Sequence, residues 1–356
     1  MTDTRPVGIL DSGFGGLSVA RAVAELLPQE NLVYAADCGF APWGDRTDDF
    51  ILERTHALVS HLLRKDVKAI VIACNTATAV CAESLRAELS MPVVGIEPAV
   101  LPGARTTRTG IIGVMATTKT LASAKYRHLK SIAPKEVRII DCPCPGLMDC
   151  VEAGEFRTPH TMALLREYVE PLVEAGADTL VLGCTHYPFL SDAIRLTAGP
   201  GIRLIDPAPA VARQLKRRLD EPGLLNDTKK APARIFCTTD ANEARERILR
   251  LLWTDNAVLQ KLDGRASSGA SGALRYSSRR PLISPGIGRL TTASPSRAAQ
   301  TAVSMQASLH SSPAWIVMAK RTDVVPMLSI HMRSTQSSPH RLGAQKSHRI
   351  PAIGNP

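Results

Sequence analysis

Two cysteines in matching surroundings are the residues of this sequence best suited to acid–base chemistry. Cys74 lies in VIACNTA (71–77) and Cys184 in VLGCTHY (181–187), where an apolar run precedes the thiol and polar residues follow it. Either cysteine alone could be a core side chain, a metal ligand, half of a disulfide or a nucleophile. As a pair on opposite faces of one substrate, the thiols suit two-base chemistry. One thiolate removes a proton from carbon, and the other thiol returns a proton from the opposite side, which inverts a stereocentre.

The other cysteines favour packing over metal binding. The nearest candidate for a metal site is Cys142-Pro143-Cys144, but its further ligands would have to come from distant loops, because no CxxC or HxxH pair is present. We therefore expect no metal. Four further cysteines are interpreted as structural: Cys38, Cys81, Cys150 and Cys237.

The sequence carries no sign of export or of a membrane span. It has no run of about 18 apolar residues, and its first residues, MTDTRPVGIL, lack a basic stretch followed by an apolar one. We therefore expect a cytoplasmic protein with reduced thiols and no membrane partner.

Basic charge is concentrated at the C-terminal end. Residues 264–356 hold ten Arg and two Lys against one acidic residue, Asp323, whereas residues 1–263 hold 31 basic and 32 acidic residues. The segment 264–356 is also rich in Ser and Pro, so we expect a disordered, solvated tail that could make at most weak contact with nucleic acid. The preceding part shows no basic patch interleaved with aromatic residues, and we expect no nucleic-acid substrate there.

Residues 1–263 alternate strand-like runs with amphipathic helical stretches. Strands are expected at 7–10, 31–37, 69–73, 92–96, 110–115, 136–141, 179–183 and 203–206. Helices are expected at 17–27, 50–65, 77–89 and 160–176. This alternation predicts βαβ units and mostly parallel sheets, which bind ligands beyond the carboxyl ends of their strands. Both Cys74 and Cys184 lie at such an end, before a helix whose first N–H groups are expected to lower the thiol pKa.

The same pattern occurs twice along the chain. Besides the two cysteine segments, three pairs follow in the same order: VGILD (7–11) with TGIIG (109–113), YAAD (34–37) with RIID (138–141), and GIEP (95–98) with LIDP (204–207). A repeat of this length indicates duplicated α/β halves. We predict an α/β fold of two pseudo-symmetric domains with mostly parallel sheets and an active site in the cleft between them. The first domain would comprise 1–98 with 209–260, and the second 99–208.

Over about residues 6 to 255 the sequence resembles the glutamate racemases of the aspartate/glutamate racemase superfamily. The resemblance rests on DSGFGGLSV (11–19), PWG (42–44), ACNTAT (73–78), GIEP (95–98), VEAG (151–154) and LGCTHYP (182–188). It implies interconversion of L- and D-glutamate without pyridoxal phosphate, metal or nucleotide, supplying D-glutamate for bacterial peptidoglycan. It also implies that Cys74 and Cys184 are the opposed acid/base pair, and we expect a homodimer.

The resemblance further assigns roles to neighbours of the two thiols. It implies that Asp11 assists Cys74, that His186 assists Cys184, and that Glu152 lies near His186. Read from the residues alone, Asp11 could equally be a turn residue, His186 a core or capping histidine, and Glu152 a solvated helix end. The expected substrate contacts are Asp11, Ser12, Pro42, Trp43, Gly44, Asn75, Thr76, Thr185 and His186. Polar residues at helix N-termini form a natural cradle for carboxylates, although simple helix capping would use the same residue types.

Some residues depart from the family pattern or allow another interpretation. Trp43 stands where the family usually has tyrosine, so a contact through the phenolic hydroxyl is lost. Gly13-x-Gly15-x-x-Ser18 resembles a dinucleotide-binding fingerprint whose third glycine is replaced by serine, and a nucleotide-binding α/β protein is thus one alternative. A second alternative, within the same superfamily, is an aspartate or hydantoin racemase. A regulatory protein that binds without turnover would show no deuterium exchange at the substrate Cα.

Overall fold

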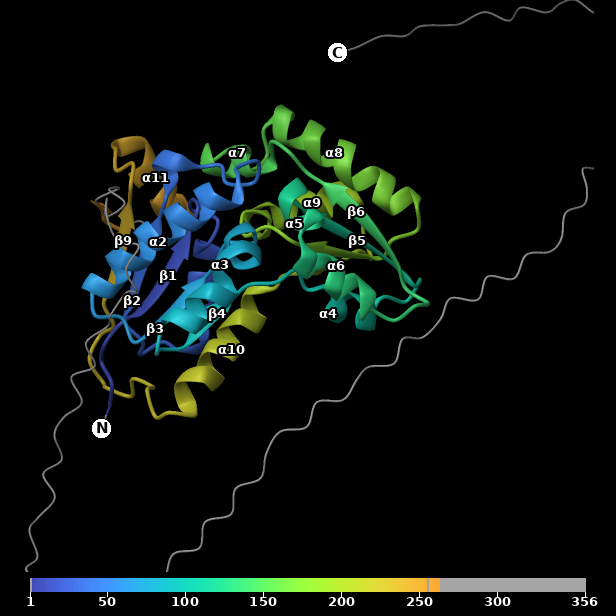
Figure 1. Cartoon of the computed structure of the whole chain (residues 1–356). Helices are drawn as coiled ribbons and strands as arrows, with labels where there is room; N and C mark the ends of the chain where they lie inside the picture. The colour runs from blue at the N-terminus through green and yellow to red at the C-terminus, as the bar shows by residue number, and fades with distance from the viewer. Residues whose placement is uncertain (1, 255, 263–356) are drawn as a thin grey trace, which may run out of the picture. The chain divides into compact units, whose positions relative to one another are not determined.

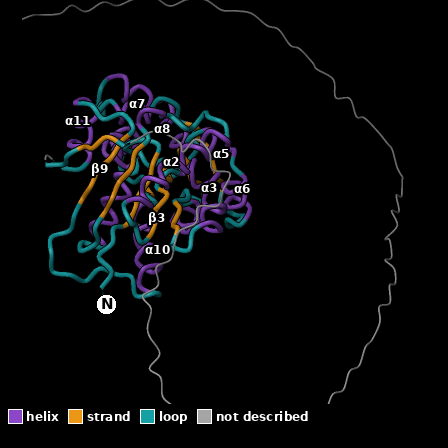
Figure 2. The backbone as a smooth tube through the Cα atoms, turned by 60° about the vertical axis from the view of Figure 1, so that its left-hand side comes forward, coloured by secondary structure: helices purple, strands orange, loops and turns teal. Residues whose placement is uncertain are grey.

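Two parallel β-sheets and the helices that pack on them make up the described part of the chain. The computed structural model describes residues 2–254 and 256–262, and the predicted tail at 264–356 lies outside them. Figure 1 shows the elements in chain order, and Figure 2 shows the strands of the larger sheet flanked by helices. The predicted α/β class with parallel sheets is confirmed.

The larger sheet has six parallel strands in the order β10-β9-β2-β1-β3-β4. Its strands are β1 (Val7–Asp11), β2 (Leu32–Ala36), β3 (Ala69–Ile72), β4 (Val93–Gly95), β9 (Arg234–Thr238) and β10 (Leu259–Lys261). Five helices belong to the same stretches of chain: α1 (Leu17–Leu26), α2 (Asp48–Arg64), α3 (Asn75–Glu88), α10 (Ala208–Asp220) and α11 (Glu243–Leu252), with a short 3₁₀ turn at Cys38–Phe40. All residues of β1, β2 and β3 are buried, as expected for a parallel sheet covered on both faces.

The smaller sheet has four parallel strands in the order β6-β5-β7-β8. They are β5 (Ile111–Ala116), β6 (Arg138–Pro143), β7 (Thr179–Leu182) and β8 (Arg203–Ile205). The helices between and around them are α4 (Val100–Thr106), α5 (Thr118–Ala122), α6 (Ala124–Ser131), α7 (Leu147–Glu152), α8 (Pro159–Glu174) and α9 (Ser191–Ala198), with a 3₁₀ turn at Tyr187–Leu190.

Helix boundaries follow local chemistry. The Thr47 side chain caps α2 by accepting the Phe50 N–H at 3.3 Å, and Asp48 and Asp49 lie in the first turn, where the helix dipole favours negative charge. At α8, Thr158 is the cap and Pro159 is the first helical residue, a position where the missing N–H costs nothing. These signals explain why the four predicted helices are confirmed to within a few residues.

All eight predicted strands are present, but two further strands were not predicted. β9 and β10 extend the larger sheet beyond β2, pairing through Leu32–Arg234 and Leu259–Phe236. β10 is three residues long and mostly exposed, and its sequence LQK is too short and too polar to show the apolar pattern of a buried strand. β10 is a strand because it pairs with β9, and this pairing is not visible in its local sequence.

The duplication predicted from sequence is visible in the strand order. The order β2-β1-β3-β4 in the larger sheet corresponds to β6-β5-β7-β8 in the smaller one, so each predicted pair of segments occupies the same place in its sheet.

The residue-by-residue alignment of the repeat was wrong for three of the four pairs. Val7 pairs with Ala69 and Ile112 pairs with Thr179, so the counterpart of Val7 is Ile112 rather than Thr109. The second and fourth pairs are displaced in the same way by two or three residues. Buried parallel strands are apolar on both faces, so their composition does not fix the register.

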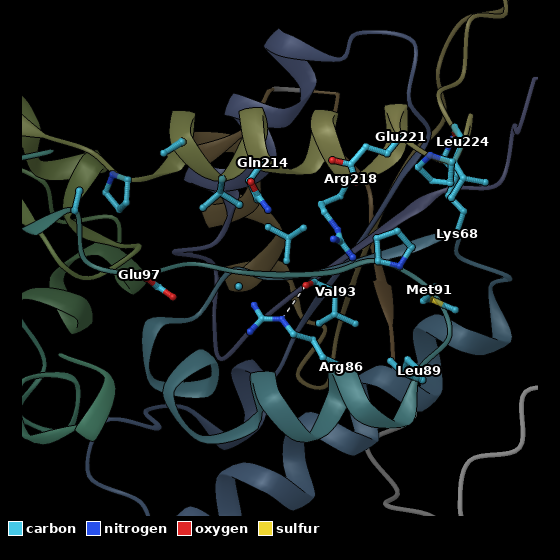
Figure 3. Close-up of a pocket in the computed structure, with 18 of the residues that line it drawn as sticks. Lys68, Arg86, Leu89, Met91, Val93, Glu97, Gln214, Arg218, Glu221 and Leu224 are labelled. Atoms are coloured by element: carbon cyan, nitrogen blue, oxygen red, sulfur yellow. Dashed lines mark hydrogen bonds between the residues drawn. The ribbon is translucent and has the colours of Figure 1, made fainter. Parts of the chain in front are cut away.

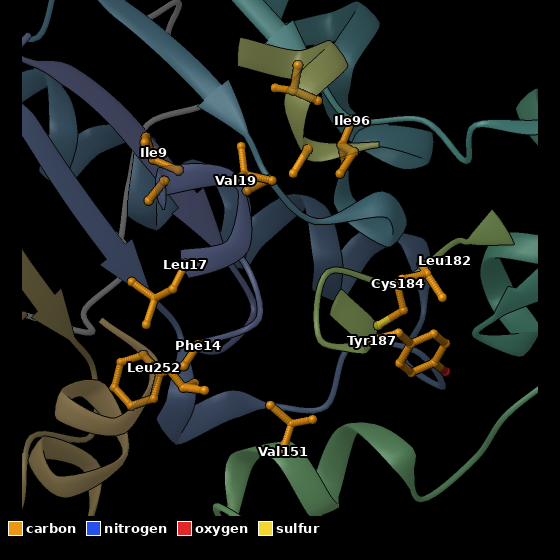
Figure 4. Packing of buried hydrophobic residues seen from close by; sticks show 14 of the residues in the cluster. Ile9, Phe14, Leu17, Val19, Ile96, Val151, Leu182, Cys184, Tyr187 and Leu252 are labelled. Atoms are coloured by element: carbon orange, nitrogen blue, oxygen red, sulfur yellow. The ribbon is translucent and has the colours of Figure 1, made fainter. Parts of the chain in front are cut away.

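The largest apolar cluster contains side chains from both sheets' surroundings. Phe14, Leu17 and Val19 follow β1, whereas Val151 and Tyr187 come from the chain around the smaller sheet (Figure 4). All five are at most 1% exposed. Burying side chains of this size contributes about 1.5–3 kcal/mol each relative to exposure, so this cluster stabilises the ends of the strands that carry the polar residues described next.

Within the described residues, no helix has both the length and the apolar content needed to cross a membrane.

Candidate active site

Cys74 lies where β3 ends and α3 begins. It is the N-cap of α3, and its Sγ accepts the Ala77 N–H at 3.4 Å and lies 3.8 Å from the Ser12 hydroxyl oxygen. The position at a strand end before a helix is confirmed. The predicted lowering of the pKa is wrong for this thiol, because burial and the nearby Asp11 carboxylate raise the pKa of Cys74 to about 12, outweighing the two hydrogen bonds.

Asp11 is a buried carboxylate at the end of β1. Its Oδ2 accepts the Gly16 N–H at 2.8 Å and the Gly13 N–H at 3.4 Å, and its Oδ1 is buried without a hydrogen-bond partner. Burial raises the pKa of Asp11 to about 6, although His186 and the Gly16 N–H act in the opposite direction. A carboxyl with this pKa can both accept and release a proton near neutral pH.

Cys184 follows β7 and lies beside an imidazole. Its Sγ is 3.6 Å from Nδ1 of His186, and Nε2 of His186 is 2.8 Å from Oε1 of Glu152. The helix expected after this cysteine is a 3₁₀ turn at Tyr187–Leu190 followed by α9 from Ser191, so no α-helix begins directly after the thiol as one does at Cys74. The neighbour of the Cys184 sulfur is thus an imidazole, whereas the Cys74 sulfur accepts an N–H from the first turn of a helix.

The His186–Glu152 pair is strongly polarised. Burial lowers the pKa of His186, but its hydrogen bonds to Cys184 and Glu152 outweigh burial and raise that pKa well above the ordinary value. Burial raises the pKa of Glu152, but His186, the Phe14 N–H at 2.6 Å and Arg245 together hold it below its ordinary value. Both directions favour an imidazolium paired with a carboxylate. Because Nε2–H then donates to Glu152, the Gly15 N–H, 3.2 Å from the same nitrogen, is a close neighbour rather than a donor to it.

One small cavity collects most of the predicted site residues. It is lined by Ser12, Trp43, Gly44, Cys74, Asn75, Thr76, Thr117, Thr120, Met148, Gly183, Cys184, Thr185 and His186. Its volume of about 20 Å³ is room for little more than one water molecule, so the walls must separate before an amino acid can enter. Both side-chain polar atoms of Asn75, and Nε1 of Trp43, are buried without a partner. Buried unpaired polar atoms are rare, and those of Asn75 are suited to a ligand carboxylate or ammonium group.

The structure brings together nearly all of the predicted residues. Asp11 and Glu152 do not line the cavity, but each interacts with a residue that does. Asp11 acts on Cys74 through its charge, and Glu152 is hydrogen-bonded to His186. Pro42 is the exception: it is exposed and does not line the cavity, and its neighbours Trp43 and Gly44 do.

Sequence reasoning missed Thr117, whose hydroxyl lies 3.4 Å from that of Thr76. The sheet register makes Ala116 the counterpart of Asp11, and Thr117 the counterpart of Ser12. The internal repeat would have indicated this residue had its register been correct.

A larger cavity lies elsewhere and contains none of these residues. It has a volume of about 1130 Å³, and Arg86, Gln214 and Arg218 are among the side chains around it (Figure 3). Its walls include Lys68, Met91 and Pro92, which precede the amino ends of β3 and β4. Chemistry in open parallel sheets is carried at the carboxyl ends, where both thiols lie, so the small cavity is the candidate active site.

All eight cysteines are buried and free of disulfides. Cys142 and Cys144 approach to 3.7 Å between sulfurs. Across residues 2–254 and 256–262, no three histidine, cysteine or acidic side chains are grouped so as to hold a metal ion.

Comparison with known proteins identifies the family. A family model described as Asp/Glu/Hydantoin racemase matches residues 18–215. The glutamate racemase of Ectopseudomonas mendocina is 47% identical over 253 residues, which are 71% of this chain and 96% of that protein. The chain belongs to the Asp/Glu/hydantoin racemase family.

Solved structures of this racemase family have the same fold. A glutamate racemase from Bacillus anthracis superposes with a TM-score of 0.66 at 32% identity, covering 72% of this chain and 97% of that one. The glutamate racemase of Escherichia coli, solved with L-glutamate and the activator UDP-MurNAc-Ala, superposes with a TM-score of 0.65 at 32% identity, covering 72% and 98%. Family membership supplies a reason for two thiols at duplicated strand ends.

The unpaired oxygen of Asp11 leads to a prediction about stability. With a folded pKa of about 6 against the ordinary 3.8, Asp11 is charged in both the folded and the unfolded chain above pH 6, and the folded state then bears a cost of about 3 kcal/mol. The cost fades as pH falls towards 4, because the folded protein binds the proton first. We expect Asp11→Asn to raise the Tm at pH 8 by about 6 °C or more and to lower racemisation at least about a hundredfold.

A matched control is Asp37→Asn. Asp37 is equally buried, but its carboxylate pairs with Arg54 at 2.8 Å, so its neutralisation should lower the Tm. Thermal unfolding at pH 8 and pH 4.5 distinguishes the two, since the gain from Asp11→Asn should shrink at the lower pH. A lower Tm for Asp11→Asn at pH 8 would contradict the prediction.

Proposed function

We propose that this protein is a glutamate racemase that interconverts L- and D-glutamate through a two-base mechanism with Cys74 and Cys184. The observation that carries the proposal is that both thiols line one cavity while each has its own ionisable partner, Asp11 for Cys74 and His186 for Cys184. Paired catalytic groups held in different environments are typical of acid–base chemistry at one carbon.

The reaction consists of two proton transfers. In one direction the Cys184 thiolate takes the Cα proton, and the electron pair of the broken C–H bond is delocalised into the substrate carboxylate. The Cys74 thiol then gives its proton to the opposite face of the same carbon. In the other direction Cys74 is the base and Cys184 the acid. No oxidation state changes, so the steps balance without a cofactor.

The charges around the two sulfurs suit these roles. An imidazolium 3.6 Å from Cys184 can stabilise negative charge on that sulfur. The raised pKa of Cys74 keeps this thiol protonated and ready to donate, and Asp11 can take its proton when the direction is reversed. Asn75, Thr76 and Thr185, with Ser12, are proposed to hold the carboxylate groups of glutamate.

Glutamate racemases typically supply D-glutamate for peptidoglycan, and we propose that this protein has the same role in a bacterial cytoplasm. We also propose a homodimer, which sedimentation of the purified chain would test; a monomer at micromolar concentration would contradict it. Two domains are proposed, 1–98 with 209–260 and 99–208, because each range holds the strands of one sheet apart from part of β10.

Deuterium exchange tests the reaction and the substrate together. In D₂O we expect L-glutamate to lose its Cα proton and its optical rotation, with L-aspartate unchanged. Exchange with aspartate alone would indicate an aspartate racemase, and exchange with neither would contradict the proposal. The same experiment on a chain ending at Asp263 tests our expectation that 264–356 is dispensable, since equal rates are expected.

A further inference from the structure

Arg245 reaches the ionisable residues behind Cys184 from a distant part of the sequence. Its Nη1 donates to Oε2 of Glu152 at 2.8 Å, and its Nε donates to Oδ2 of Asp240 at 3.4 Å. Arg245 lies in the first turns of α11, which follows β9 of the larger sheet, whereas Glu152 ends α7 near the smaller sheet. The contact therefore joins the surroundings of the two sheets at the site.

The Glu152 carboxylate is fixed by donors on both oxygens. Oε1 receives the Phe14 N–H and faces His186, and Oε2 receives Arg245. The Glu152 side chain is 10% exposed, so Oε2 would have little access to water in place of the guanidinium. Loss of one partner of a nearly buried ion pair leaves the other charge uncompensated and free to rotate or take up a proton.

We propose that Arg245 is a positioning residue for Cys184, an inference that rests on the proposed racemase function. By holding Glu152 ionised and in one orientation, Arg245 keeps His186 doubly protonated, with Nδ1–H directed at Sγ of Cys184. Asp240 fixes the other end of the guanidinium, so the chain of contacts runs Asp240–Arg245–Glu152–His186–Cys184.

This role predicts an effect on one thiol of the pair. Cys74 has its direct contacts with Ser12 and Ala77 and is affected by the charge of Asp11, whereas Cys184 has its contact with His186. The two enantiomers of glutamate have equal free energy, so kcat/KM must fall equally in both directions and cannot reveal the asymmetry. Primary deuterium isotope effects can, because they report how far each Cα–H cleavage limits the rate.

The test compares Arg245→Met with Arg247→Met, an exposed arginine on the same helix. Arg245→Met is expected to lower kcat/KM about tenfold, as for other groups that orient a catalytic side chain. With glutamate deuterated at Cα, the isotope effect should rise for the enantiomer that Cys184 deprotonates and fall for the other. The enantiomer in question is the one whose Cα proton Cys74→Ala still exchanges. Arg245→Lys should recover part of the rate, since a lysine keeps the positive charge but lacks the planar guanidinium that donates to Glu152 and Asp240 together.

The outcomes separate this inference from the proposed function. If the unmodified enzyme racemises glutamate and Arg245→Met behaves like Arg247→Met, the positioning role is overturned. If the unmodified enzyme does not racemise glutamate, the proposed function fails instead. Should Arg245→Met not fold, Asp240→Ala removes the acceptor of the Arg245 Nε–H without removing the charge of the arginine. It should shift the two isotope effects in the same opposite directions, and unchanged isotope effects would overturn the inference.

Discussion

Cys74→Ala and Cys184→Ala are each expected to lower racemisation at least about a thousandfold, towards the upper end of the range for loss of a positioned acid or base. Each variant removes one of the two thiols that line the cavity, so in the proposed mechanism a proton can be taken from carbon but not returned from the opposite side. We expect each variant to retain Cα exchange with one enantiomer only, and the two variants to retain it with opposite enantiomers.

Cys81→Ala is the matched control for the thiol pair. Cys81 is as buried as the two site cysteines, but it lies on α3 against Thr55, away from the cavity. Its loss should cost stability without changing turnover per folded molecule. Proton exchange in D₂O, followed separately for L- and D-glutamate, supplies the measurement. If either site variant racemises at a rate near that of the unmodified enzyme, the two-base assignment is wrong.

Gly15→Ala is expected to lower activity about a hundredfold, the loss that can follow from a 1 Å displacement of catalytic groups. A Cβ at Gly15 would lie 2.3 Å from Nδ1 of His186, far inside contact distance. His186 is buried and bonded to Glu152, so the ring cannot turn away without breaking that bond. The strain should also cost about 1–3 kcal/mol of folding free energy.

A double-mutant cycle isolates the cause of that loss. If the clash is with the imidazole, Gly15→Ala should cost much less Tm in a His186→Asn background than in the unmodified chain. Gly39→Ala is the control, since the nearest atom to its added Cβ is the Thr239 hydroxyl at 3.2 Å. Equal effects of Gly15→Ala in both backgrounds would contradict the proposed clash.

These contacts also give the glycine loop a purpose other than phosphate binding. At Gly13 an added Cβ would lie 2.3 Å from Oε1 of Glu152, and at Gly15 it would meet His186. The two glycines thus let the backbone after β1 approach the polar pair from the other half of the chain. In the sequence this loop resembles a dinucleotide fingerprint, but in the structure its glycines allow close packing against Glu152 and His186.

The sequence by itself determined the class of fold, the duplication and the two thiols. Buried parallel strands read as apolar runs, and a cysteine that ends such a run in both halves is visible without coordinates, as are the residues next to it. The register of the repeat was not determined, because a strand buried on both faces looks alike when shifted, and Thr117 was missed for that reason.

Only the tertiary structure decided the environment of each site residue. Burial depends on what packs from elsewhere, so the helix dipole anticipated at Cys74 was outweighed by desolvation and by Asp11, which no local pattern could reveal. Arg245 is 93 residues from Glu152 along the chain and lies on a helix after a strand that was not predicted. Charge interactions act through space, whereas sequence patterns report neighbours along the chain. The two thiols and, through the family resemblance, Asp11, His186 and Glu152 could therefore be named from the sequence, whereas the pKa shifts of these groups and the contact of Arg245 with Glu152 could not.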